Sequence, residues 1–397
     1  MSEDKLVDLD NQDTSFELKQ QLLSEAVDLE ATSSDIAKPK STKNINAYNR
    51  IITVVRIVCF IFFLIFTALL INEVFIEPYK TRKAIDLAKE LYYQTDEYNS
   101  DTPAASPTIS AKVTETVISE NKTNPKDYDN IKVESSEAPI VLEDFKELLE
   151  INEDVKGWLT IPNSNIDYPV LQNPEDEEYY LTRDINREKR KAGSLFLNHK
   201  SSIERNTQNL VIHGHNVKED YMFHRLRNFK KYIDYYKERP VITFHTLYEK
   251  AQWKIFSVFV TNGSNKTEEL FDFTQSEFRD SSEFLNFVYQ LKARSIYQID
   301  TVDINEEDQL LTISTCSYEL NNYRLVIVAR KLREGEEAVV DVESVRKNEN
   351  PLKPSSWYEE YGGEKPEIGT FEEALAAGEI EWYKPVTKEN ESCNSEN

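Results

Sequence analysis

The chain has 397 residues, of which 71 are acidic and 47 are Lys or Arg, so its formal net charge is −24. Such acidity excludes a protein that binds nucleic acid, because phosphate contacts need clustered Lys and Arg side chains. Hydrophobic residues make up 39%, enough for a folded core but not for a polytopic membrane protein, and the three cysteines are too few and too scattered for a disulfide framework or a zinc ribbon.

One apolar segment over residues 51–76 predicts a single transmembrane helix. Residues 57–71 (IVCFIFFLIFTALLI) carry no charge, and a helix crosses a bilayer with about 20 mostly apolar residues. A buried core helix would leave a polar face somewhere along this run. A cleaved signal peptide would begin near the N-terminus, rather than after about 50 residues.

The basic residues beside this segment predict its orientation. Five Lys or Arg residues lie between positions 38 and 56, and three lie between positions 80 and 83. Because the side richer in Lys and Arg stays cytoplasmic, we expect residues 1–50 to form a cytoplasmic tail. The rest, 77–397, would lie outside a cell membrane that the chain crosses once. An outer domain without a cysteine pair favours a Gram-positive surface.

Residues 77–139 predict a stalk and a flexible linker. Apolar residues at helical spacing over 79–93 indicate a short stalk helix. From Gln94 to about Pro139 the sequence consists mostly of Ser, Thr, Pro, Asn and acidic residues. Such a composition buries too little surface to fold, so we expect a tether there. An amphipathic helix then begins near Val141.

Residues 140–333 predict a mainly β domain. Short β-rich segments are broken by turns, which favours a closed or nearly closed β-barrel. One helix interrupts them, with Ser281–Ser282 as the expected N-cap and an apolar stripe through Leu291. The expected strands are 158–161, 168–172, 194–198, 210–213, 241–245, 252–261, 296–304, 309–315 and 324–332.

Residues 334–397 form an acidic C-terminal extension. From Gly335 onward it holds 16 acidic and 6 basic residues. A disordered tail is one interpretation. The repeated pairs Trp357–Tyr358 and Trp382–Tyr383 suggest that part of the extension docks on a surface, and this domain's own surface is one candidate.

Three segments carry candidate chemistry. Cys316 directly follows the expected strand 309–315. The segment His213-Gly-His-Asn216 lies at the end of another strand, and Arg324 begins the strand after the thiol. A lone cysteine is more often a buried small hydrophobe. Together, however, these residues offer a nucleophile for carbonyl carbon, an imidazole to protonate a departing amine, and a cation for oxyanion charge.

The sequence resembles the sortases, and among them class B. The thiol segment Leu311-Thr-Ile-Ser-Thr-Cys316 matches the family's TLxTC signature, with Arg324 downstream and the Gly-His step of residues 213–216 upstream. Residues 140–333, about half of the chain, take part. Further matching segments are 157–158, 161–162, 166–170, 192–196 and 284–295.

The resemblance implies an eight-stranded sortase β-barrel with short helices, preceded by one transmembrane helix, and a cysteine transpeptidase. Cys316 would attack a Thr carbonyl in the sorting signal of a secreted surface protein, with Arg324 supporting the oxyanion. His215 would protonate the leaving amine, and Ser314 and Thr315 would line the substrate groove. An amine of a peptidoglycan precursor or of a pilin subunit would resolve the thioester. No metal or organic cofactor is implied.

Several alternatives stay open from the sequence. His213 and His215 share a strand face, and with Cys316 they could form a metal site. Arg330 lies on the same strand face as Arg324. The chain could join pilin subunits instead of anchoring proteins to the cell wall, or it could be a non-catalytic binding module tethered to the membrane. The long N-terminal tail and the C-terminal extension depart from the family, and we expect the extension to influence substrate access.

Overall fold

The computed structural model describes residues 42–99, 139–217, 220–263 and 270–386. Most of the expected cytoplasmic tail, nearly all of the expected tether and Cys393 lie outside the described residues. The chain divides into two compact units, one ending at Asn72 and one running from Glu73 to Asn397.

The first unit contains helix α2 (Thr42–Ile71), which is followed by the π-helical turn η2 (Asn72–Ile76). The helix over Tyr48–Gln94 includes an 18-residue window with a mean hydropathy of 2.9, none of it buried. Such a long, exposed, apolar surface is costly in water and suits the interior of a bilayer. The helix begins nine residues before the expected start at residue 51, and its length and composition fit a single membrane span.

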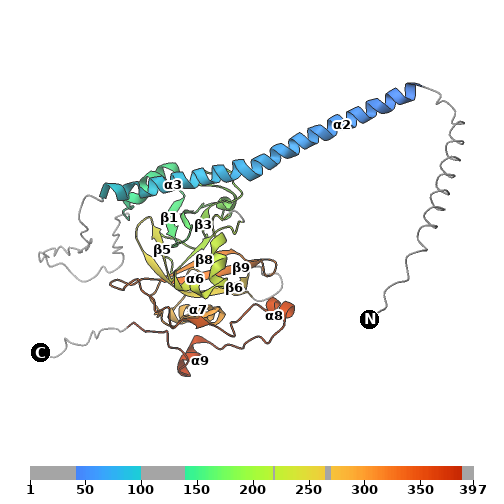
Figure 1. Ribbon diagram of the computed structural model, residues 1–397. Coiled ribbons are helices and arrows are strands. Elements are labelled where there is room, and N and C mark those ends of the chain that lie inside the picture. The colour runs from blue at the N-terminus through green and yellow to red at the C-terminus, as the bar shows by residue number, and fades with distance from the viewer. Residues whose placement is uncertain (1–41, 100–138, 218–219, 264–269, 387–397) are drawn as a thin grey trace, which may run out of the picture. The chain divides into compact units, whose positions relative to one another are not determined.

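The second unit closes eight strands into a barrel in the order β1-β2-β3-β4-β8-β9-β6-β5 (Figure 1). This confirms the mainly β, eight-stranded fold expected from the sequence. The pairs β2–β3 and β4–β8 are parallel, and the other pairs are antiparallel. The barrel strands are β1 (Val155–Thr160), β2 (Asp167–Leu171), β3 (Leu195–Leu197), β4 (Asn209–His213), β5 (Val241–Thr246), β6 (Gln252–Asn262), β8 (Leu310–Cys316) and β9 (Tyr323–Lys331).

The expected strand over 296–304 is wrong for most of its length. Only β7 (Tyr297–Gln298) forms, and it pairs outside the barrel with β10 (Arg346–Lys347) from the C-terminal extension. The apolar residues of this segment, Ile299, Val302 and Ile304, are all buried. The β-branched residues of this segment predicted a strand, but the buried ones anchor an irregular loop.

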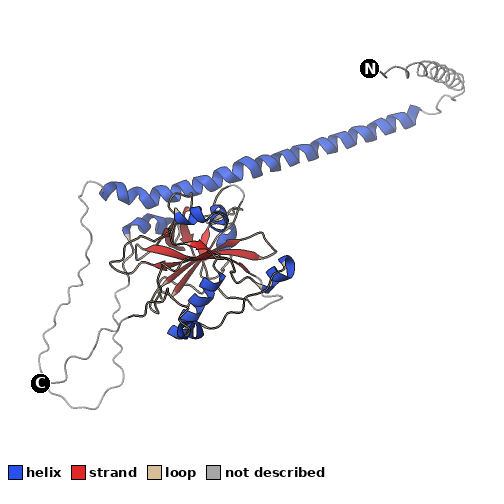
Figure 2. Ribbon diagram, turned by 60° about the horizontal axis from the view of Figure 1, so that its bottom comes forward, coloured by secondary structure: helices blue, strands red, loops and turns tan. Residues whose placement is uncertain are grey.

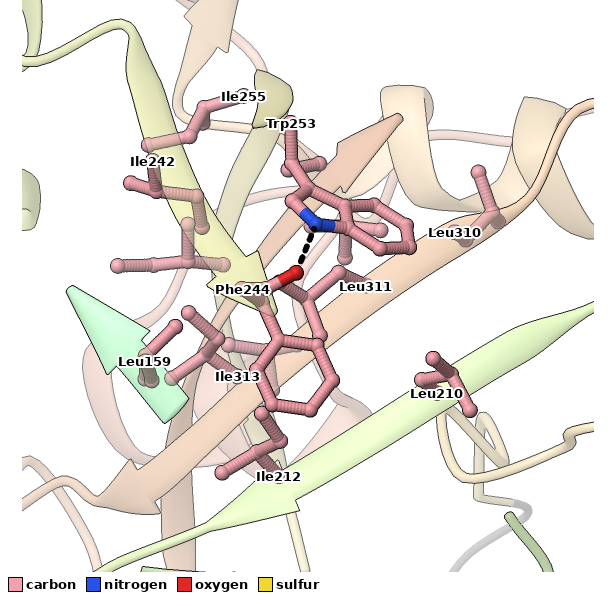
Figure 3. Packing of buried hydrophobic residues seen from close by; sticks show 14 of the residues in the cluster. Leu159, Leu210, Ile212, Ile242, Phe244, Trp253, Ile255, Leu310, Leu311 and Ile313 are labelled. Atoms are coloured by element: carbon pink, nitrogen blue, oxygen red, sulfur yellow. Dashed lines mark hydrogen bonds between the residues drawn. The ribbon is translucent and has the colours of Figure 1, made fainter. Parts of the chain in front are cut away.

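The barrel core consists of large apolar side chains contributed by different strands. Figure 3 shows Ile212, Phe244, Ile313 and their neighbours packed together, all of them fully buried. The indole Nε1 of Trp253 donates a hydrogen bond to the Phe244 carbonyl at 3.1 Å. Because small barrels are filled by their own side chains, this packing fixes the strands and therefore the positions of their ends.

Helix α3 (Glu77–Asn99), which includes the expected stalk helix, packs against the barrel. Its Ala88 and Tyr92 are buried, and the Tyr92 ring stacks on Trp158 with 4.2 Å between the centroids. Lys89 adds an ion pair with Asp167 at 3.0 Å. Within the described residues, the other helices between α3 and α7 are η3 (Glu143–Phe145), α4 (Lys146–Ile151), η4 (Tyr179–Thr182), η5 (His224–Leu226), α5 (Arg227–Lys231) and α6 (Ile233–Lys237).

Helix α7 (Ser281–Arg294) lies on the opposite side of the barrel from α3 (Figures 1 and 2). Its N-cap is Asp280, not the expected Ser281–Ser282. The Asp280 carboxylate accepts the backbone N–H of Glu283 at 2.9 Å, which satisfies an amide that the helix itself leaves unpaired.

The C-terminal extension docks on this domain as far as the structure describes it. It contains helices α8 (Ser355–Tyr361) and α9 (Phe371–Ala376). Phe371 and Trp382 are buried, and Trp382 O accepts the N–H of Ile304 at 2.9 Å. The second Trp-Tyr pair therefore contacts the domain's own surface.

An ion network ties the start of this extension to the barrel. Arg330 on β9 is fully buried, and its Nη2 donates to Glu336 at 2.7 Å. Lys254 on β6 contacts the same carboxylate at 2.6 Å. Burial disfavours the ionised form of Glu336, but the hydrogen bonds from Arg330 and Lys254 outweigh burial and hold its pKa well below the usual range.

We predict that Glu336→Gln lowers the free energy of unfolding by about 2 kcal/mol at neutral pH, because it removes the nearest carboxylate from the buried Arg330 guanidinium and leaves, among the described residues, only Asp303 at 3.6 Å and Asp308 at 4.0 Å. A carboxyl with a depressed folded-state pKa stabilises the fold above its ordinary pKa of 4.5 and loses that effect as the pH falls toward the folded value. Urea unfolding should therefore show the difference between wild type and variant shrinking in acid. An unchanged difference would contradict the ionic origin.

Candidate functional site

The β8–β9 hairpin brings Cys316 and Arg324 together. Cys316 is the last residue of β8, just beyond the buried part of the strand, and it is half-buried. Arg324 lies directly opposite it in the antiparallel register. Facing residues in such a pair point to the same side, with Cβ atoms about 4.5–5.5 Å apart. The hairpin thus sets a cation beside the thiol.

The side chain of Arg324 crosses Gly263 at the end of β6. A Cβ on Gly263 would lie 2.9 Å from the Arg324 Cγ, so a larger residue would displace the arginine. The guanidinium Nη1 donates to the Tyr323 carbonyl at 3.3 Å. No carboxylate in the described part of the chain pairs with Arg324, which leaves the charge available for an anionic group.

His215 follows strand β4, which is parallel to β8. Gly214 lies between the end of β4 and His215, and its N–H donates to the Ser314 carbonyl of β8 at 3.2 Å. The His215 Nε2 bonds to the Leu181 carbonyl at 2.8 Å. Because a carbonyl oxygen only accepts, Nε2 carries the hydrogen, and Nδ1 is the nitrogen that can exchange a proton. Burial lowers the pKa of His215, against the hydrogen bond to Leu181.

Cys316, His215 and Arg324 line the same cleft at this end of the barrel. The structure thus brings together all three residues that the sequence analysis selected for the chemistry.

Asn216 is a residue that sequence reasoning did not select. Its side-chain Nδ2 donates to the Cys316 carbonyl at 3.0 Å, and its own carbonyl accepts the Tyr318 hydroxyl at 2.8 Å. It therefore ties the histidine loop to the thiol hairpin. Its place at the end of His-Gly-His-Asn was the available signal.

His213 lines the cleft but is held by its neighbours. Its Nε2 lies 3.2 Å from Asn198 Nδ2, and its ring packs against Phe196 at 5.5 Å. Burial lowers the pKa of His213 to about 4, with Glu177 opposing the shift. This imidazole is neutral at physiological pH.

Ser314 and Thr315 also lie in the wall of the cleft, although both are almost fully buried. The Thr315 hydroxyl donates to the Gly214 carbonyl at 2.7 Å, so it is engaged in holding β4 to β8. The Ser314 hydroxyl has no partner in the described part of the chain. Arg330, the alternative arginine, pairs with Leu310 at the far end of the hairpin from Cys316.

Comparisons with known proteins identify the family. A family model described as a sortase domain matches residues 159–332. Sortase B of Listeria monocytogenes is 32% identical over 181 residues, which cover 45% of this chain and 69% of that protein. Sortase B of Staphylococcus aureus is 28% identical over 191 residues, which cover 48% and 75%.

Among solved structures, a mutant form of sortase B from Clostridium perfringens matches with 29% identity and a TM-score of 0.44, over 48% of this chain and 87% of that one. The match to the Listeria protein, over more than two thirds of its length, decides the family. The chain belongs to the sortase family and is a class B-like sortase transpeptidase.

Proposed function

We propose that this chain is a membrane-anchored cysteine transpeptidase that cleaves the sorting signal of secreted surface proteins and transfers the acyl group to an amine of the cell wall. The observation that carries the proposal is the direct cross-strand pairing of Cys316 with Arg324, in a cleft that His215 also lines.

In the first half-reaction, the Cys316 thiolate adds to the scissile carbonyl carbon and forms a C–S bond. The Arg324 guanidinium stabilises the oxyanion that develops. Collapse of this intermediate breaks the C–N bond, and Nδ1 of His215 gives its proton to the departing amine. A thioacyl-enzyme remains on Cys316.

In the second half-reaction, the acceptor amine adds to the thioester carbonyl and loses a proton to His215. The thiolate leaves, an amide forms, and the enzyme returns to its starting state. Ser314 and Thr315 are proposed to line the groove that holds the sorting signal beside the thiol.

The apolar helix would anchor this reaction at the cell membrane. We propose that residues 51–76 cross the cell membrane, with 1–50 cytoplasmic and 77–397 outside. Residues 77–139 would serve as stalk and linker, 140–333 as the catalytic domain and 334–397 as its acidic extension. Secreted substrates and membrane-bound cell-wall precursors both meet at that surface, so anchoring raises the effective concentration of each.

Mass spectrometry of the full chain tests the proposal. Incubated with a panel of sorting-signal peptides without an acceptor, the protein should gain the mass of the acyl fragment, and digestion should place that adduct on Cys316. The chain's other thiols, Cys59 and Cys393, are internal controls. No adduct with any peptide, or an adduct on either control thiol, would refute the assignment. Adding cell-wall amines or pilin subunits then identifies the acceptor.

We also predict the pH dependence of the reaction. His215 must be neutral to take the proton of the thiol, so activity falls in acid once this imidazole is protonated. Because burial lowers the pKa of His215 from 6.5, the acid limb of kcat/KM should have its midpoint below that value. A pH profile of peptide cleavage measures it. An acid limb above 6.5 would exclude His215 as the titrating group, and His213→Gln should leave the limb in place.

A further inference from the structure

A small polar pocket lies where the C-terminal extension passes the end of β6 and the end of helix α7. Arg294 from α7 and Lys353 and Lys365 from the extension line it, and Lys365 Nζ reaches Ser355 Oγ at 3.0 Å. Neutral hydrogen-bonding groups come from Thr261, Asn262 and Ser355. No Asp or Glu belongs to this lining among the residues described. In a chain of net charge −24, three cations without an acid form a local reversal of charge.

The cations of this pocket contact aromatic rings rather than carboxylates. The Arg294 guanidinium lies 4.1 Å from the centre of the Phe271 ring, and Lys353 Nζ lies 5.2 Å from that of Trp357. No ion pair involves Arg294, Lys353 or Lys365 within the described ranges. The pocket's positive charge is therefore not neutralised by the fold.

Two of the three cations, Arg294 and Lys353, are also partly withdrawn from water. Burial lowers the pKa of Arg294 to about 10, and no nearby carboxylate opposes the shift. Burial also lowers the pKa of Lys353, with Glu319 opposing and Lys230 adding to the shift. The Arg294 guanidinium donates to the carbonyl and the side-chain oxygen of Gln290, at 2.9 and 2.6 Å, and both of these acceptors are neutral. A desolvated charge without a counter-charge costs free energy, and a bound anion would recover part of that cost.

The surroundings of the pocket connect it to the candidate catalytic cleft. Asn262 and Phe271 line both the pocket and the cleft that holds Cys316. On its other side the pocket opens into a wider groove along α7 that contains Glu283 and Glu367. The Glu283 carboxylate is already bound by Arg279 at 3.1 Å, so it does not neutralise the pocket.

We propose that this pocket binds a diphosphate-class anion beside the catalytic cleft. Three cations match a multiply charged group, whereas a single carboxylate would leave two of them unpaired. Arginine and lysine are the side chains that proteins use for phosphate, with hydroxyl and amide donors completing the contacts. The diphosphate is either free in solution or carried by the amine acceptor; the second source rests on the proposed function.

Calorimetry on the full-length Cys316→Ala protein tests the binding without any catalysis. Inorganic pyrophosphate should bind, and the double variant Arg294→Gln/Lys365→Gln should bind it at least about tenfold more weakly. The control is Arg205→Gln/Lys231→Gln, which removes the same charge from exposed positions. No binding to the parent, or equal weakening in the control, overturns the proposal.

Kinetics with the catalytically intact chain separate the two sources. One amine acceptor carries a diphosphate, and a second has the same amine without it. A rise of about tenfold in the KM of the first alone, in the Arg294→Gln/Lys365→Gln variant, supports the acceptor-borne anion. Unchanged KM values for both overturn that source and assign the pocket to free diphosphate. If no thioacyl-enzyme forms at all, the proposed function fails while the calorimetric result stands.

Discussion

Replacing Arg324 by glutamine is expected to lower kcat for cleavage of a sorting-signal peptide by about 10²–10³-fold, the usual effect of removing one preorganised oxyanion donor. Arg324 lies opposite Cys316 in the hairpin, and no described carboxylate neutralises it. In the proposed mechanism its charge acts where the oxyanion develops. Glutamine keeps an N–H donor on a shorter side chain, and it loses the charge and the paired N–H groups of the guanidinium.

Two further variants give this prediction its control. Arg324→Lys restores the charge as a single ammonium, so it should recover part of kcat but not all of it. Arg205→Gln removes an exposed arginine that pairs with Glu277, and it should leave the kinetics unchanged. If Arg324→Gln raised only KM and kept kcat, the arginine would bind substrate uniformly, and the oxyanion role would be wrong.

The geometry of the candidate site is fixed because the core of the barrel holds the strand ends in place. Leu311 and Ile313 of β8 are packed among the residues of Figure 3. Cys316 lies beyond them on the same strand, and β4 delivers His215 from the parallel neighbour. Each of these side chains thus lies at or near the end of a rigid strand. Sites built on strands and helices keep their distances and angles more precisely than sites built on loops.

The sequence predicted the parts of this site that are local. Cys316 at a strand's end and Arg324 at the next strand's start are eight residues apart, so a hairpin brings them together. The position of β4 beside β8 depends on parallel pairing between distant segments, which periodicity does not encode. For that, the family resemblance was needed.

The wrong and missing predictions also concern contacts between segments that are distant in the sequence. Residues 296–304 are rich in strand-forming side chains, yet only Ile296 bonds to a barrel strand, through the Val258 carbonyl of β6. The carbonyl of Ile299 accepts from Lys292 of α7, and the N–H of Ile304 donates to Trp382 of the extension. Glu336 reads as one more acid in an acidic tail. Only the fold reveals that it faces the buried Arg330. Docking of the extension was hinted at by its Trp-Tyr pairs, but its targets are long-range contacts that no local pattern specifies.

Helix α8 of the extension contacts the hairpin that carries Cys316 and Arg324. Trp357 stacks on Tyr323, the residue before Arg324, with 6.4 Å between the ring centroids. The Tyr361 hydroxyl donates to the Glu319 carbonyl at 2.9 Å, three residues after the thiol. Trp357 and Tyr361 also pack on each other at 4.5 Å. One short helix therefore holds both arms of the turn.

Trp357→Ala is expected to lower kcat by about 100-fold, because a shift of about 1 Å between reacting groups can cost that much. Trp357→Phe keeps a ring on Tyr323 and should restore most of the activity. Tyr361→Phe removes only the hydrogen bond to Glu319 and should have a smaller effect. Steady-state kinetics well below each variant's melting temperature measure these differences.

The matched control is Trp382→Ala, at the other end of the extension. Trp382 is buried against Phe371, away from the hairpin. Its loss should lower the melting temperature at least as much as Trp357→Ala does, because a larger cavity forms, while kcat changes little. If the two alanine variants lost activity in proportion to their lost stability, the extension would support the fold in general. A selective loss in Trp357→Ala instead means that the extension positions Cys316 and Arg324.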